Sequence, residues 1–106
     1  MSAEFDFSEA RVVYAPELRF KAFAEREMAH CVLLLEVGQD GFKGAPARFY
    51  RVPVECWGRL AEQAAGLQVN AVLRDVRGEV RSSRWVGKKD GKEHFDVVLK
   101  AKEFFH

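Results

Sequence analysis

Two tryptophans and one basic segment are the residues of this sequence best suited to bind a ligand. Trp85 lies in the polar stretch RSSRWVGKK, and Trp57 ends a strand-like segment in which Phe49 and Arg51 occupy positions on the same face. A flat aromatic ring can stack on an exposed base, which is worth about 1–3 kcal/mol per base. A neighbouring cation can bind phosphate with release of counterions. These residue types predict a surface that binds single-stranded nucleic acid.

The basic residues are concentrated near Trp85. Residues 77–92 include six Lys or Arg and two acidic residues, so this segment carries +4 in a chain whose net charge is +1. A basic segment on a slightly acidic remainder can hold phosphates locally, although a solvated hairpin would have the same composition. The predicted nucleic-acid-binding residues are Phe49, Arg51, Trp57, Arg81, Arg84, Trp85, Lys88, Lys89 and Lys92. Arg77 is a further candidate.

Each aromatic ring has an alternative place in the hydrophobic core. Trp57 abuts a predicted helix and could pack beneath it, whereas the polar surroundings of Trp85 favour exposure. Phe95, Phe104 and Phe105 are predicted to be core or interface residues.

The sequence contains no catalytic or metal-binding pattern. His30 and Cys31 are adjacent in a strand-like run, so their side chains point to opposite faces. Cys31 and Cys56 lack zinc or redox spacing and are expected to be buried free thiols. The glycine-rich stretch GQDGFKG at 38–44 does not have the spacing of a phosphate-binding loop. We therefore expect a binding protein with no enzymatic activity, no cofactor and no metal.

Length and composition predict one globular domain over residues 1–106. The chain is 48% hydrophobic and 31% charged, which is ordinary for such a domain. No apolar run approaches the ~20 residues of a membrane span, and residues 1–7 do not resemble a signal peptide. We expect a cytoplasmic protein that does not associate with membranes.

Strand patterns dominate the chain. Strands are predicted over 9–13, 27–37, 48–57, 69–80 and 94–105, with a loop at 38–47 and a basic hairpin tip at 81–93. A helix over 57–67, with Leu60, Ala64 and Leu67 on one face, separates the third and fourth strands, and Gly66 is expected to end it. The order predicts an all-β fold, a five-stranded barrel of the oligonucleotide/oligosaccharide-binding (OB) type with one short helix between strands 3 and 4.

Alternation predicts which strand residues face the core. The expected core face of the third strand carries Tyr50, Val52, Val54 and Cys56. Val72, Val76 and Val80 share one face of the fourth strand, and Phe95, Val97, Leu99 and Ala101 lie on one side of the fifth.

Several segments resemble known OB-fold families. WGRLAE at 57–62, RGEVRSSRW at 77–85 and KDGK at 89–92 resemble the bacterial single-stranded DNA-binding protein (SSB) family, as does PELRF at 16–20. AHCVLLLE at 29–36 and YRVPVECWG at 50–58 resemble the paralogous primosomal replication protein N, which acts at replication restart. The resemblance implies binding of single-stranded DNA on the strand face of Phe49 and Trp57. It also implies a homo-oligomer, a dimer ahead of a tetramer.

The resemblance has departures that leave two functions open. The sequence ends with KAKEFFH, where SSBs usually continue into an acidic tail that recruits partners, and KAFAERE at 21–27 replaces a glycine-containing turn. The first function is SSB-like binding of DNA in replication, repair or recombination. The second is an adaptor at replication restart that binds mainly replication or restart proteins, and DNA only weakly. RNA is a third ligand class that such a fold accepts.

Overall fold

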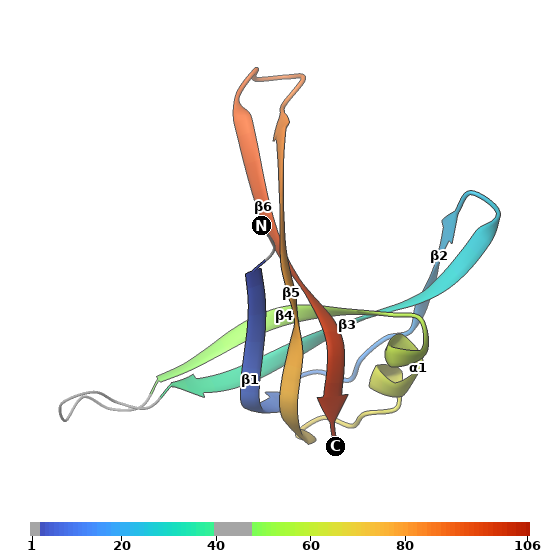
Figure 1. Ribbon diagram of the computed structural model, residues 1–106, viewed down its shortest axis with the longest axis vertical. Helices are drawn as coiled ribbons and strands as arrows, with labels where there is room; N and C mark the ends of the chain where they lie inside the picture. Colours follow the sequence, from blue (N-terminus) through green and yellow to red (C-terminus); the bar gives the residue numbers. More distant parts are fainter. Residues whose placement is uncertain (1–2, 40–47) are drawn as a thin grey trace.

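The computed structural model describes residues 3–39 and 48–106, and strands make up most of it (Figure 1). The elements are β1 (Ala3–Val12), β2 (Arg19–Phe23), β3 (Arg26–Gln39), β4 (Arg48–Trp57), α1 (Arg59–Ala65), β5 (Val72–Val86) and β6 (Glu93–Phe105). Of the loop predicted at 38–47, Gly38 and Gln39 belong to β3, and 40–47 lie outside the described residues. No helix in the described ranges is long and apolar enough to cross a membrane.

Five strands close into a ring. The sheet order is β1-β5-β6-β4-β3-β2, and β1 also pairs with β3 through Val12 and Leu35. This second pairing joins β1, β5, β6, β4 and β3 into the ring, and β2 extends the sheet outside it. The helix lies between the third and fourth strands of the ring in chain order. The OB-like fold predicted from the sequence is therefore confirmed.

The core fills the interior of the ring. Its largest fully buried side chains include Leu33, Leu35, Val54, Leu73 and Val76, and each contributes about 1.5–3 kcal/mol by leaving water. The helix α1 packs against β3 and β4 beside this core (Figure 1).

The strand β2 was not predicted. Its five residues pair with β3 to form a hairpin that extends away from the ring, on the right in Figure 1. The side chain of Phe20 in this strand is exposed, so the strand could not be recognised from a buried apolar residue at this position. Main-chain pairing across a short turn stabilises the hairpin. The stretch KAFAERE at 21–27 therefore contains the end of β2, the turn and the start of β3.

The helix is shorter than the predicted range 57–67. Trp57 is still paired with His30 in the sheet, and Gly58 takes φ 65 where the strand turns into the helix, a conformation that glycine adopts readily. Gly66 ends the helix, as expected. Ala64 and Leu67 of the predicted face are buried, and Leu60 is partly buried against the core. Ala61, which was not part of that prediction, is also buried.

An irregularity in β5 changes which of its side chains face the core. Asp75 has φ 50, and the register with β6 shifts between Arg74 and Arg77. A bulge of this kind places Leu73 and Val76 both inside although they are three residues apart. Val72 is consequently exposed while Val76 is buried, which corrects the prediction that these two residues share one face.

The predicted core face of β4 and the predicted apolar side of β6 are buried only where these strands line the ring. Val54, Cys56 and Ala101 are buried, whereas Tyr50 and Val97 are exposed. Figure 1 shows that the paired strands β3 and β4, and likewise β5 and β6, continue beyond the ring. Phe95 and Phe105 are also exposed. They are therefore not core residues, and an interface role for them stays a prediction. Phe104 packs against the core.

The two cysteines are buried free thiols, as predicted. Cys31 and Cys56 lie opposite each other in the β3–β4 register. Burial, with smaller effects from Cys31 and Glu55, raises the pKa of the Cys56 thiol to about 12. This thiol is therefore protonated and unreactive near neutral pH.

Candidate nucleic-acid interface

The outer face of β4 carries its predicted ligand-binding residues. Because side chains alternate along a strand, Phe49, Arg51 and Trp57 lie on the face opposite the buried Val54 and Cys56. Phe49 is 68% exposed and lies over Gly38 of β3. Trp57 lies eight positions after Phe49 along the strand, about 26 Å at strand spacing, so these two rings occupy opposite ends of the face.

This outer face continues across β6 onto β5. Glu55 of β4 lies opposite Lys100 of β6, and Lys100 lies opposite Glu79 of β5. Residues opposite one another in paired strands share a face. Counting in steps of two along β5 then brings Arg81 and Trp85 onto the face of Trp57, so these two residues share one outer surface with the three predicted residues of β4.

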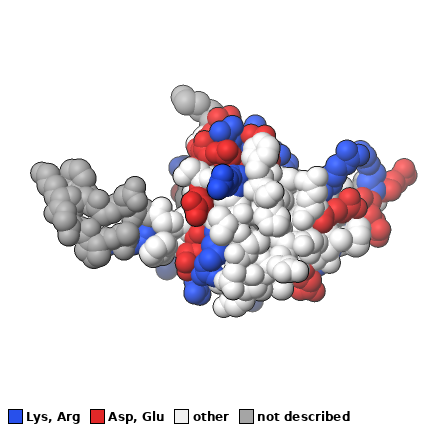
Figure 2. Space-filling model, turned by 90° about the horizontal axis from the view of Figure 1, so that it is seen from below, with Lys and Arg blue, Asp and Glu red and all other residues white. Residues whose placement is uncertain are grey.

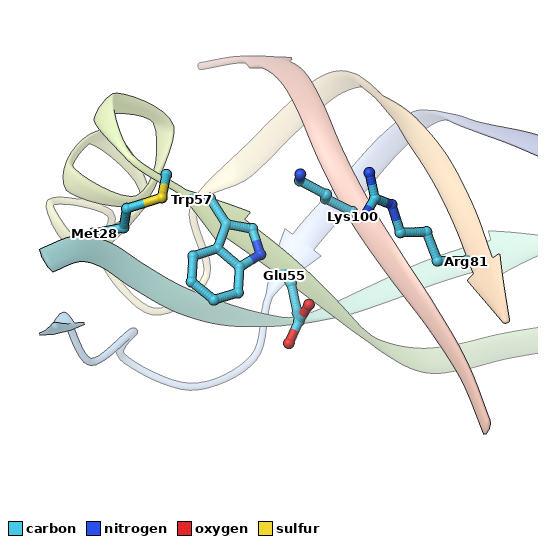
Figure 3. A pocket seen from close by; sticks show the side chains of 5 residues that line it. All are labelled: Met28, Glu55, Trp57, Arg81 and Lys100. Carbon is cyan, nitrogen blue, oxygen red and sulfur yellow. The ribbon is translucent and has the colours of Figure 1, made fainter. Parts of the chain in front are cut away.

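Trp57 lines a pocket of about 340 Å³, whose other lining residues are Met28, Glu55, Arg81 and Lys100. In Figure 3 the indole lies in the middle, with Met28 on one side and the two cations on the other. The Nζ atom of Lys21 lies 5.6 Å from the centre of the Trp57 ring. This pocket combines an aromatic ring with positive charge.

A buried histidine supports the pocket. His30 is 5% exposed, and its ring centre lies 4.2 Å from that of Trp57. Its Nε2 atom is 3.2 Å from Oε1 of Glu55. His30 therefore contacts both the ring and the carboxylate of the pocket. No group of three or more potential metal ligands occurs among residues 3–39 and 48–106.

Arg81 is oriented by a neighbouring carboxylate. Its Nε atom donates to Glu79 at 3.2 Å, and Lys102 lies 3.1 Å from the other oxygen of Glu79. The hydrogen bond from Lys102, followed by that from Arg81, lowers the pKa of Glu79. A guanidinium has five donors, so Arg81 retains N–H groups for a phosphate. Arg51 is 3.9 Å from Glu36.

The β5–β6 hairpin projects beyond the ring, at the top of Figure 1, and Trp85 is the next-to-last residue of β5. This side chain is 49% exposed and stacks on His94 with ring centres 5.6 Å apart. The turn is held by Asp90, which accepts a hydrogen bond from the Lys92 backbone, and by Gly91 at φ 66. The predicted tip lysines Lys88, Lys89 and Lys92 are all exposed.

Two of the predicted cations are engaged by other groups of the protein. Arg84 is paired with Phe95 in the register, and its guanidinium lies over that ring on the face opposite Trp85, 5.8 Å from the ring centre. Arg77 contacts Asp6 at 3.3 Å and Glu103 at 3.4 Å, so its charge is engaged within the protein.

The sequence reading missed Lys100, Lys21, Met28 and Glu55. Lys100 lies on the side of its strand opposite Leu99 and Ala101, and it reaches Trp57 through the parallel β4–β6 pairing. Lys21 and Met28 lie opposite each other in the unpredicted β2–β3 hairpin. No local pattern in the sequence identifies these contacts.

The underside of the molecule offers a contrast to the hairpin. Figure 2 shows Lys and Arg beside Asp and Glu there, together with a broad uncharged area. Charges of both signs in proximity produce little net field. Attraction of a phosphate therefore depends on local groups such as Arg81, Lys100 and the tip lysines.

No family model matches this sequence, and no curated protein is significantly similar to it. Solved structures do resemble it. The small single-stranded DNA-binding protein of Streptomyces coelicolor is 16% identical, with a TM-score of 0.64 over 100% of this chain and 94% of that one.

Two further solved structures also resemble this chain. The SSB domain of a Synechococcus protein is 20% identical, with a TM-score of 0.61 over 99% of this chain and 93% of that one. The protein priB of Ralstonia solanacearum is 14% identical, with a TM-score of 0.66 over 97% and 96%. The resemblance to SSB and to its primosomal paralogue that the sequence indicated thus agrees with these structures, and the chain has the OB-like fold that they share.

Proposed function

We propose that this chain binds single-stranded DNA along the outer face of β4, β6 and β5. The observation that carries the proposal is the common placement of Trp57, Arg81 and Trp85 on that face, with Lys100 beside them. Bases stack on the two indoles, and phosphates bind the cations between and beyond them. The lysines of the hairpin tip extend the path. Proteins named for single-stranded DNA binding share the fold.

The proposed biological setting is DNA replication, repair or recombination in the cytoplasm, with binding rather than catalysis as the activity. The candidate face combines stacking rings with cations, which suits a ligand that offers both bases and phosphates. Phe49 and Arg51 would contact DNA at the far end of β4, where Phe49 is exposed.

The proposal includes a homo-oligomer, with a dimer preferred to a tetramer. Along residues 3–9, β1 pairs with β5 on one side, while its pairing with β3 in the described chain involves Arg11 and Val12. An edge of unpaired main-chain groups is usually covered, and a second copy of the chain can cover it. Light scattering tests this assignment, and a monomer across the working concentration range would contradict it.

A titration with oligo-dT tests the DNA-binding proposal. Tryptophan fluorescence should be quenched on binding, and affinity should fall as salt rises because phosphate contacts release counterions. The Arg77→Ala variant is the control in this titration, because the Arg77 guanidinium is already engaged by Asp6 and Glu103. Absence of binding at low salt would refute the proposal.

A second candidate function is a restart adaptor that binds proteins. One observation favours it: the face of the hairpin opposite Trp85 exposes Val86, Phe95 and Val97. Exposed apolar side chains grouped on one face are typical of protein contacts. This function predicts weak or absent quenching by oligo-dT at low salt.

A further inference from the structure

We propose that the Trp57 pocket selects a base with an exocyclic amino group, and cytosine in particular, through the carboxylate of Glu55. This inference rests on the proposed binding of single-stranded DNA and specifies which bases one position of that surface prefers. It concerns the pocket formed by Met28, Glu55, Trp57, Arg81 and Lys100.

The starting observation is a carboxylate in a surface that otherwise suits phosphate. Arg81 and Lys100 attract the backbone, and an acidic group beside them weakens that attraction. In Figure 3, however, Glu55 lies next to the Trp57 indole, while the two cations come from the other side of the pocket. A base stacked on the indole would therefore present its edge to Glu55 and its phosphate to the cations.

A contact with His30 fixes the position of the Glu55 carboxylate. His30, which is nearly fully buried, has its Nε2 atom 3.2 Å from Oε1 of Glu55. The same imidazole packs against the Trp57 ring. A carboxylate has about four acceptor positions, and His30 occupies one, so acceptors remain for a ligand. The ring and the acceptor are thus positioned together before any base arrives.

Base chemistry then determines the preference. Cytosine carries an amino group at position 4, and carboxylates accept hydrogen bonds from it. Uracil and thymine carry a carbonyl oxygen at that position, which would face the carboxylate with two acceptors opposed. The pocket should therefore favour cytosine over uracil, two bases of nearly the same size.

The test compares oligo-dC with oligo-dU of equal length, at mildly alkaline pH so that cytosine is unprotonated. The wild-type chain should bind oligo-dC about tenfold more tightly than oligo-dU. Glu55→Gln should lose most of this preference, because an amide both donates and accepts and so tolerates either base. Thermal unfolding of the variant confirms that it folds.

Asp96→Asn is the matched control. Asp96 of β6 is exposed and lies four positions before Lys100 on the same outer face, outside the lining of the pocket. Its substitution removes the same charge and should change affinity for both oligonucleotides together, with the preference retained.

The outcomes separate the two proposals. Equal binding of both oligonucleotides by the wild type, or a cytosine preference that survives in Glu55→Gln, overturns the base selection and leaves DNA binding intact. Binding of neither oligonucleotide, nor of oligo-dT, refutes the proposed function itself.

Discussion

Trp57 and Trp85 lie on the same face of the sheet, but the protein supports them differently. Trp57 ends β4 where the strand turns into α1, and it packs against the buried His30. Trp85 stands on a hairpin beyond the ring and stacks on His94, a partly exposed residue. A side chain already held in position loses less conformational freedom on binding. The pocket is thus the preorganised part of the surface, and the hairpin is the adaptable part.

The largest effect on DNA binding is expected for Trp57→Ala. Loss of one stacked base should weaken oligo-dT binding by roughly 5- to 150-fold, toward the upper end because the ring is preorganised. Anisotropy of a labelled oligonucleotide measures the change without relying on tryptophan emission. Retention of wild-type affinity by a folded variant would contradict the assignment of the pocket.

Arg81→Ala and Arg84→Ala form the next comparison, because the two arginines lie on opposite faces of one hairpin. Arg81→Ala should weaken binding and reduce the slope of log affinity against log salt by about 1. Arg84→Ala should change both quantities less, since this side chain lies over Phe95. Salt titrations of the two variants give the slopes, and equal slopes would show that both faces contact DNA.

Trp85→Ala should have a smaller effect than Trp57→Ala, near the lower limit of about fivefold. The reason is that Trp85 is half-exposed and must be ordered on binding. Parallel titrations with oligo-dT measure both variants. A larger loss for Trp85→Ala would reverse the comparison and make the hairpin the principal binding element.

The smallest expected effect is on the free energy of unfolding, and it arises from Cys56, the residue before Trp57. Burial raises the pKa of Cys56 from 9.0 to about 12, so the folded state disfavours the thiolate. The stabilising contribution of the protonated thiol is complete below pH 9 and declines as the pH rises toward 12. Urea unfolding across this range should show the decline.

Cys56→Ala is the variant that isolates this contribution. It should reduce the dependence of unfolding free energy on pH, although Cys31, whose pKa is also raised by burial, retains part of it. Identical pH dependence in the two proteins would mean that the Cys56 thiol is accessible to water.

Much of the fold could be predicted because its patterns are local. The sequence predicted the alternation in β4, the turn residues near Gly91 and the helix end at Gly66. The strand β2 was missed because its hairpin buries little apolar surface. The altered face of β5 was missed because the irregular φ of Asp75 has no signature in a run of alternating residues.

The candidate site was only partly predictable. Trp85 and Arg81 were found because aromatic and basic residues cluster in the sequence. Lys100 was not, because its proximity to Trp57 depends on pairing between β4 and β6. Arg84 was grouped with Arg81 because charge alone does not distinguish the two faces of a strand.

By itself, therefore, the sequence determined the kinds of element and the residue types available for binding, since propensity, alternation and turn chemistry act between near neighbours. The tertiary structure decided which of those residues meet. Ring closure and strand register join segments far apart in the chain, and they place Trp57, Arg81, Trp85 and Lys100 together while turning Arg84 away. These choices depend on long-range pairing, in which a shift of one residue exchanges the faces of a strand.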